Sequence, residues 1–431
     1  KTKGLLFCLN FYYNTLMEKK CVIDKRLIEY IVSHEVSENA FLPNGKINPK
    51  YNSSKKTGLI SQILEDHWNV FSLQHYDTIL KYRPNAFSEI KKVIDCMNKN
   101  LGCSIYECPE CHDVIFVSNT CKSRMCTSCG YKYKMIRVEN ILEKVYNCNH
   151  RQIVFTIPKE LRRFFYSFKY MDLLFDAVCQ TIYSIFNIKY KKDKKGRLKK
   201  YVSKIKYLPG FYSFLHTFGR DMKWNPHIHV LLAELKIGDG ELIKKIDYFD
   251  FDSLSKRFQK ILYDLMDKNI PEFTQIIKNT QYEQHKNGLY VYAEKKKFKH
   301  LKDGIEYVAR YCGRPCISEN RIISYDGQNV TFSYIDHYDN VEKNKTVSAL
   351  EFISLLLDHL IPYNFRTIRS YGFYHTKSKA DNKIIKLISE EKHKLRRQFL
   401  KFEISILKSF NRNPLYCPHC DVKMYLLCLV T

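Results

Sequence analysis

The stretch Trp224-Asn225-Pro226-His227-Ile228-His229-Val230-Leu231-Leu232 determines the predicted fold of this 431-residue chain. Its β-branched and apolar residues favour a strand, and strand side chains alternate between two faces. His227 and His229 therefore project from the same face, where they could share one metal ion. Taken alone, such a pair on an apolar strand is more often structural than catalytic.

The segments around this strand predict a sheet. Residues 211–218 form the preceding strand, residues 219–226 the connection and residues 227–234 the partner strand of an antiparallel hairpin. Further strands are expected at residues 153–157, 288–294, 321–325 and 330–335. Helices are expected at residues 59–99, 134–146, 173–188, 258–270 and 348–360, the last opened by a capping box of Ser348 and Glu351. The pattern predicts an α+β domain with a central antiparallel sheet and flanking helices.

Composition divides the chain into four predicted parts. Residues 1–57 form an N-terminal extension of unknown role, and residues 58–147 a helical, cysteine-rich domain of zinc-ribbon type. Residues 148–380 form the α+β catalytic domain, in which residues 190–206 are expected to be a lysine-dense loop. Residues 381–431 combine a basic helix with a cysteine knuckle.

The charge balance indicates the class of partner. Lys and Arg outnumber Asp and Glu by 71 to 45, for a formal net charge of +26. This surplus favours a polyanion, and nucleic acid above all, through counterion release. Solvated faces in a lysine-rich proteome would explain the composition about as well. The apolar run at residues 5–13 falls well short of the ~20 residues of a membrane span, so no membrane association is expected.

Cysteine spacing predicts zinc. Half of the 16 cysteines lie between residues 96 and 148, which favours metal binding in a reducing cytoplasm over a disulfide framework. The pairs Cys108-x-x-Cys111 and Cys126-x-x-Cys129 fit one shared tetrahedral ion, with four buried free thiols as the alternative.

The remaining cysteines leave alternatives open. Additional thiols nearby suggest a second zinc whose fourth ligand would be His112 or Cys148; these thiols are Cys96, Cys103 and Cys121. Near the C-terminus, Cys417 and Cys420 form a lone knuckle with His419 and Cys428 as candidate companions. Half a site is weak support, and free thiols fit this knuckle equally well.

A phosphodiester is a poor electrophile, so a divalent cation at the histidine pair would lower the barrier to its cleavage. Imidazole ligands suit Mn²⁺ better than Mg²⁺, although Mg²⁺ fits if oxygens and waters complete an octahedron. A third protein ligand is expected. His216 on the neighbouring strand is the first choice, and Asp221 in the connection is the second.

Two tyrosines downstream are candidate nucleophiles. Tyr307 and Tyr311 lie one helical turn apart, so both phenols can reach the same phosphate. Their unperturbed pKa of ~10 requires activation, for which the metal, Arg310 and Arg314 are candidates. The chain has 32 tyrosines, and helical pairs also arise by chance.

Several of these motifs, in this order, resemble the IS91 family of bacterial insertion-sequence transposases. The matching blocks are Leu215-His216-Thr217-Phe218-Gly219-Arg220-Asp221, Asn225-Pro226-His227-Ile228-His229, Tyr307-Val308-Ala309-Arg310-Tyr311-Cys312-Gly313-Arg314-Pro315 and Tyr371-Gly372-Phe373-Tyr374. The resemblance extends from about residue 87 to the C-terminus. It implies an HUH-type endonuclease, related in chemistry to rolling-circle initiators and relaxases, preceded by a cysteine-rich zinc-binding domain.

The resemblance also implies residue roles. His227 and His229 would be metal ligands, and Tyr307 and Tyr311 the nucleophiles that form a 5′-phosphotyrosine link. Since the family includes members with one catalytic tyrosine, the division of labour between the two stays open. Cleavage of single-stranded element ends and strand transfer, as in rolling-circle transposition, is the expected function.

Basic residues near the tyrosines suggest a DNA path. A lysine run precedes the tyrosine helix and comprises Lys295, Lys296 and Lys297. Tyr290, Tyr292 and Phe298 could stack on unpaired bases of single-stranded DNA.

Two alternatives to a transposase remain. One is a plasmid replication initiator or relaxase, and the other is a zinc-dependent DNA-binding protein without catalysis. A metallopeptidase is disfavoured because no His-Glu-x-x-His helix is present. A bacterial cytoplasmic protein associated with the nucleoid is expected.

Overall fold

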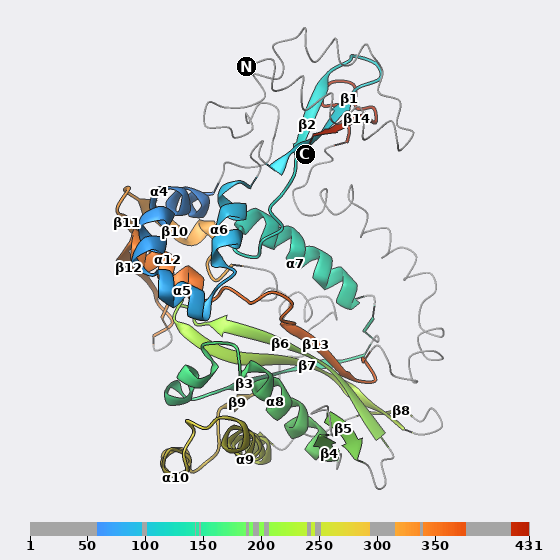
Figure 1. Ribbon diagram of the computed structural model, residues 1–431. Coiled ribbons are helices and arrows are strands. Elements are labelled where there is room, and N and C mark those ends of the chain that lie inside the picture. Colours follow the sequence, from blue (N-terminus) through green and yellow to red (C-terminus); the bar gives the residue numbers. More distant parts are fainter. Residues whose placement is uncertain are drawn as a thin grey trace. The chain divides into compact units, whose positions relative to one another are not determined.

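The computed structural model describes twelve stretches of the chain. They are residues 58–96, 101–142, 144–145, 148–186, 189–192, 198–201, 207–238, 243–245, 251–293, 315–336, 339–375 and 415–430. Contacts divide it into two compact units, a larger one around a six-stranded sheet and a smaller one around a three-stranded sheet (Figure 1). No helix within these stretches is both long enough and apolar enough to cross a membrane.

The larger unit is built on an antiparallel sheet, as the sequence predicts. Its strand order is β13-β6-β7-β3-β9, with β8 also paired to β7. The strands are β3 (His150–Thr156), β6 (Tyr207–Phe218), β7 (Trp224–Gly238), β8 (Ile243–Lys245), β9 (Val291–Tyr292) and β13 (Ile368–Gly372). The predicted hairpin is β6–β7, the longest pair of the sheet, and strands with flanking helices confirm the α+β prediction.

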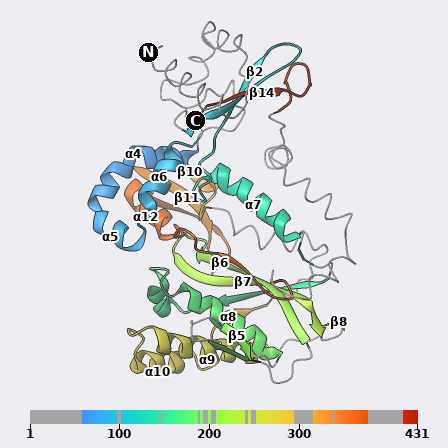
Figure 2. The same ribbon diagram turned by 45° about the vertical axis from the view of Figure 1, so that its right-hand side comes forward.

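One face of this sheet carries the main core. Ile228, Val230 and Leu232 alternate along β7 and pack with Phe211 and Leu215 of β6. Two helices cover this face in both views, α8 (Met171–Ile185) and α9 (Phe251–Asn269) (Figures 1 and 2). Burial of so many apolar side chains from both layers supplies most of the driving force for folding of this unit.

The opposite face is divided between a second core and the histidines. Helix α7 (Thr127–Leu142) packs Val138 and Ile141 on Tyr212 and Phe214 of β6. Residues at alternate positions of β6 and β7 share this face with His216, His227 and His229, because directly paired residues point to the same side. The histidines therefore belong to the face that α7 covers, not to the main core.

A tight contact at the edge strand explains the Tyr371-Gly372-Phe373 motif. Gly372 has a φ of +64°, and a Cβ there would meet the Pro209 carbonyl oxygen at 1.6 Å. The Phe373 ring in turn fills the space where Gly210 has no side chain. Only glycine allows β13 to close onto β6 in this way.

A helical layer stands at one end of the sheet. It contains α4 (Leu59–Gln74), α5 (Tyr76–Tyr82), α6 (Ala86–Ile94) and α12 (Ala349–Asp358), with the small sheet β10 (Ile322–Tyr325), β11 (Asn329–Ile335) and β12 (Glu342–Ser348). The hairpin at Asp326-Gly327 and the Ser348 cap, which accepts from the Glu351 N–H, confirm two sequence predictions.

A buried arginine ties this helical layer to the sheet domain. The Arg83 guanidinium donates to the carbonyls of Leu357 and Asp358 at the end of α12, and to that of Tyr166 after the 3-10 helix η2 (Lys159–Phe165). It therefore adds charged hydrogen bonds to carbonyls of the last turn of α12, where the helix dipole favours a cation. Burial lowers the pKa of Arg83, because removing the charged guanidinium from water costs free energy. These hydrogen bonds offset that cost.

Three predicted elements differ in extent. The lysine-dense loop contains a hairpin, β4 (Lys189–Lys192) with β5 (Leu198–Tyr201), and the strand expected at residues 288–294 is only the two-residue β9. Helix α7 begins at Thr127, seven positions earlier than expected, so its first turn contains Cys129. The remaining helix α10 (Gln275–Gln284) follows α9.

The smaller unit is organised by strands from distant parts of the chain. Its sheet has the order β14-β1-β2, with β1 (Cys103–Glu107), β2 (Val114–Ser118) and β14 (Tyr425–Val430), all antiparallel. The expected basic helix at residues 386–410 lies outside the described residues. Strand β14 nevertheless brings the C-terminal cysteine knuckle to the β1–β2 hairpin.

Candidate functional site: a histidine cluster and two cysteine groups

Three histidines converge on one face of the large sheet. His216 of β6 is paired directly with His227 of β7, and His229 follows two residues on. Their ligand nitrogens all lie within 4.8 Å of one another. Of the two residues considered as third partner of the histidine pair, His216 joins the group. Asp221 instead forms an ion pair with Lys223.

Hydrogen bonds orient two of the three rings. His227 Nδ1 donates to the Asn225 carbonyl at 2.7 Å, which leaves Nε2 as the ligand nitrogen. The Gln152 side-chain amide nitrogen, Nε2, lies 2.9 Å from His229 Nδ1. If this amide turns by about 180°, its oxygen accepts from Nδ1–H, and Nε2 of His229 then becomes the ligand nitrogen.

Two of the three rings, those of His216 and His229, are neutral imidazoles. His216 is 2 % exposed and His229 is 8 % exposed. Burial, followed by the neighbouring histidines, lowers the pKa of both well below its ordinary value. A neutral imidazole has a free lone pair and is the form that coordinates a cation. Three adjacent imidazoles can therefore share one bound metal ion, which supplies the positive charge at the cluster.

The turn between the two strands is fixed by a further histidine. His359, at the end of α12, donates from Nε2 to the Met222 carbonyl at 2.8 Å and contacts the Thr217 hydroxyl through Nδ1. Its ring stacks on Trp224. This contact holds the β6–β7 connection at the end where His216 and His227 lie.

The predicted nucleophiles lie outside the described residues. This holds for Tyr307 and Tyr311, and for the predicted DNA-binding residues Arg310, Arg314, Lys295, Lys296 and Lys297. The described chain reaches this segment through β9, where Tyr292 is paired with Val154 and Val154 with His229. Tyr292 therefore projects on the histidine face of the sheet.

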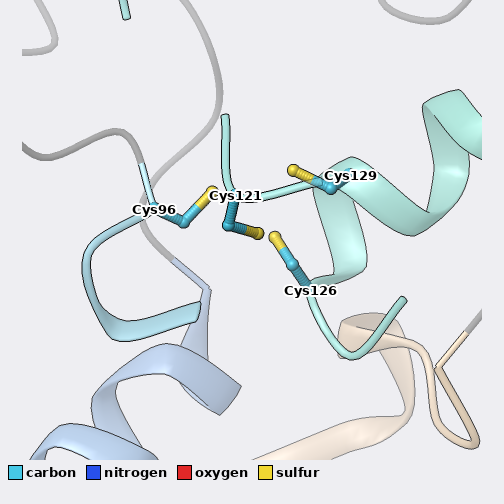
Figure 3. A group of neighbouring side chains, drawn as sticks. All are labelled: Cys96, Cys121, Cys126 and Cys129. Carbon is cyan, nitrogen blue, oxygen red and sulfur yellow. The ribbon is translucent and has the colours of Figure 1, made fainter. Parts of the chain in front are cut away.

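A first group of four cysteines contains Cys96, Cys121, Cys126 and Cys129. Their sulfurs lie within 4.8 Å of one another and face a common centre (Figure 3). All four side chains are buried. Four thiolates at this separation are the donor set of a closed tetrahedral zinc site.

A second group contains Cys108, Cys111, Cys417 and Cys420, again with every sulfur within 4.8 Å of the others. Burial raises the pKa of Cys108, but backbone N–H groups of Cys111 and Glu110 outweigh it and bring the value to about 7. Contact with the Cys111 thiol, together with burial, raises the pKa of Cys420 to about 12. Crowded thiols of this kind ionise together only when a cation compensates their charge.

This arrangement corrects the predicted pairing of cysteines. Cys108 and Cys111 do not share a centre with Cys126 and Cys129, because each pair completes a different group. Cys103 belongs to neither group and is buried in β1. The other candidate ligands also have different partners: His112 contacts Glu107, Cys148 contacts His150, and His419 contacts Asp113.

Comparison with known proteins agrees with these features. A family model described as a transposase zinc-binding domain matches residues 63–157, and one described as a putative transposase matches residues 210–382. The transposase for insertion sequence element IS801 of Pseudomonas savastanoi pv. phaseolicola is 26% identical over 301 residues, which is 66% of this chain and 69% of that protein. The chain belongs to the IS91 family of transposases.

A second relative, the putative transposase y4qJ of Sinorhizobium fredii, is 25% identical over 297 residues, 64% of this chain and 71% of its own. No solved structure matches the transposase. The zinc-binding domain match includes all four cysteines of the first group, and the second match includes all three clustered histidines. Zinc binding and action on DNA are therefore properties of the family to which this transposase belongs.

A repeated motif was the signal for the correct cysteine pairing. Cys108-Pro109-Glu110-Cys111 and Cys417-Pro418-His419-Cys420 share a Cys-Pro-x-Cys pattern, whereas Cys126-Thr127-Ser128-Cys129 has no proline. Proline has no N–H and a fixed φ, so it favours a turn at the first pair, while Thr127 and Ser128 can begin a helix. No comparable sequence signal marks the positioning roles of Arg83 and His359.

Proposed function

We propose that this transposase cleaves single-stranded DNA at the ends of its element by tyrosine attack and then transfers the cut strand. The observation that carries the proposal is the convergence of three imidazoles on one sheet face, two of them kept neutral by burial, in a family of transposases. The tyrosines are Tyr307 and Tyr311, assigned by their resemblance to the family motif. An HUH-type active site is the architecture that this combination favours.

His216, His227 and His229 would hold a Mn²⁺ or Mg²⁺ ion. When bound, such an ion polarises a non-bridging phosphate oxygen and lowers the barrier by several kcal/mol. Three ligands leave coordination positions for the substrate, unlike a closed four-cysteine site. The Asn225 carbonyl directs Nε2 of His227 toward the cluster, and the Gln152 amide would do the same for His229 with its oxygen turned to Nδ1.

The chemical step is a transesterification without redox change. A tyrosine Oη loses its proton to solvent and bonds to phosphorus, while the bond from phosphorus to the 3′ oxygen breaks. The leaving oxygen takes up a proton and becomes a 3′-hydroxyl, and the 5′ end stays on the enzyme as a phosphotyrosine ester. Since an ester replaces an ester, the linkage retains the energy needed for rejoining to a target.

An exposed aromatic pair supports an unpaired DNA substrate. Tyr290 and Tyr292 are 62% and 47% exposed, and their rings are nearly parallel with centroids 6.3 Å apart. Tyr292 lies on the face of the histidine cluster, separated from β7 only by β3. Aromatic side chains in a basic protein are the usual stacking partners of unpaired bases.

The test is trapping of the covalent adduct. Incubating the protein with Mn²⁺ and labelled single-stranded element ends should yield a protein–DNA adduct whose modified residue can be mapped by mass spectrometry. Tyr307→Phe/Tyr311→Phe should abolish the adduct, whereas Tyr76→Phe, an exposed tyrosine on α5, should leave it unchanged. An undiminished adduct in the double variant refutes the nucleophile assignment. DNA binding with no adduct in the parent would favour a non-catalytic binding protein.

A further inference from the structure

Two turns from opposite ends of the chain have the same construction. One is the Cys108 knuckle, residues 108–113, and the other is the Cys417 knuckle, residues 417–422. In each, the first cysteine N–H donates to the carbonyl five residues on, Asp113 in one and Val422 in the other. In each, the residue four positions after the first cysteine, His112 in one and Asp421 in the other, donates its N–H to the carbonyl of that cysteine.

The similarity extends to backbone conformation and to the sulfurs. The residue four positions after the first cysteine has a left-handed backbone conformation in both turns, with a φ of 58° at His112 and 53° at Asp421. The first sulfur accepts a backbone N–H in both, that of His419 for Cys417 and those of Cys111 and Glu110 for Cys108. Such sulfur-directed N–H groups stabilise a thiolate.

The separations of the four sulfurs fit one metal ion. Zinc–sulfur bonds of about 2.3 Å in a tetrahedron place neighbouring sulfurs about 3.8 Å apart. Cys111 Sγ and Cys417 Sγ are 3.5 Å apart, far beyond a disulfide bond of about 2.05 Å. Ile115 and Met424 pack against Cys108 and Cys417, so apolar side chains adjoin the centre.

Backbone pairing between β1 and β14 joins the two knuckles. Strand β14 follows the Cys417 knuckle and pairs along the whole of β1, which leads into the Cys108 knuckle. Both matched family regions end before residue 383, so the C-terminal pair lies outside the matched zinc-binding domain.

We propose that Cys108, Cys111, Cys417 and Cys420 hold a structural zinc ion that fastens the C-terminal strand to the β1–β2 hairpin. The ion has four protein ligands and no open position, so it takes no part in cleavage. The site is independent of the proposed nuclease chemistry, because it shares no residue with the histidine cluster.

Metal analysis of the full-length protein tests this site. Cys417→Ser/Cys420→Ser should bind one zinc fewer per chain than the parent, whereas Cys103→Ser, on the same sheet but in neither group, should lose none. Unchanged zinc content in the folded double variant overturns the proposal.

Thiol labelling of the unaltered protein covers the case in which the double variant does not fold. With zinc bound, all four cysteines should resist alkylation, and a chelator should expose them together, as followed by peptide mass spectrometry. Cys417 and Cys420 labelled equally fast with and without chelator would also overturn the proposal. Adduct formation is measured separately, so failure of the nuclease assignment is distinguishable.

Discussion

The histidine cluster and the cysteine groups differ in the number of candidate ligands and in how the chain assembles them. The histidine cluster has three candidate ligands from one hairpin, and His216 and His227, eleven positions apart, are directly paired. The second cysteine group has four, and Cys111 and Cys417 are separated by 306 positions. A three-ligand site on a sheet face suits catalysis, whereas a closed four-ligand site stabilises the fold.

The largest expected effect separates these two roles. His227→Ala removes a ligand but little apolar packing, so adduct formation in Mn²⁺ should fall by at least about 100-fold while the free energy of unfolding changes little. Cys417→Ser/Cys420→Ser should lose zinc yet retain the cleavage rate on a short oligonucleotide. Single-turnover adduct kinetics, beside urea denaturation, measure both. His75→Gln, an exposed histidine before α5, is the control. Full adduct formation by His227→Ala would remove the distinction between a catalytic histidine cluster and a structural cysteine group.

The second effect contrasts the cluster with two buried histidines outside it. His150 accepts from the Tyr374 hydroxyl and donates to the Cys148 carbonyl, and burial lowers its pKa to about 4. Burial also lowers the pKa of His359 to about 4. Because the folded pKa is depressed, the unfolded state takes up protons first as pH falls below about 6.5, so stability rises with pH between about 4 and 6.5.

Each of these two histidines should therefore cost about 3 kcal/mol of stability between pH 7 and pH 4. Urea denaturation of the metal-free protein across this range measures the loss. His150→Gln should reduce the pH dependence, and His75→Gln should not. An unchanged pH dependence in His150→Gln would show that His150 is not held neutral.

Local sequence patterns predicted most of the histidine site. Alternation placed His227 and His229 on one face, and His216 was the first choice of third ligand, but its position directly opposite His227 came only from the structure. The same local rules gave α8, the Ser348 cap and the Asp326-Gly327 turn. The nucleophiles stay predictions, because Tyr307 and Tyr311 lie outside the described residues.

Long-range assembly explains what local patterns missed. Cys126-x-x-Cys129 looks like the partner of Cys108-x-x-Cys111 by spacing, but its second cysteine lies within α7 and its real neighbours are Cys96 and Cys121. Pairing of β1 with β14 depends on strands more than 300 positions apart, which no periodicity encodes. The buried contacts of Arg83 with α12 are similarly remote in sequence.

The third prediction sharpens the account of how the histidines are directed. Gln152→Leu keeps the approximate volume at a buried position on β3 but removes the amide beside His229. Loss of such an orienting group typically weakens metal binding about 10- to 100-fold. The Mn²⁺ concentration for half-maximal adduct rate should rise, while the rate at saturating Mn²⁺ changes less. Gln152→Glu, which keeps an acceptor oxygen, should restore binding; an unaltered Mn²⁺ dependence in Gln152→Leu would dismiss the orienting role.

The smallest effect concerns the aromatic pair beside the cluster. Tyr292→Ala removes one stacking surface, which at about 1 kcal/mol per base weakens single-stranded DNA binding roughly 5-fold. Tyr292→Phe retains the ring and should bind normally, so the pair of variants separates stacking from hydroxyl chemistry. Fluorescence anisotropy with single-stranded and duplex oligonucleotides measures it. Because duplex bases are already stacked, the affinity for duplex DNA should not change. An equal loss of affinity for single-stranded and duplex DNA would mean that Tyr292 contacts the DNA backbone. The histidine face would then lack a selective path for unpaired DNA.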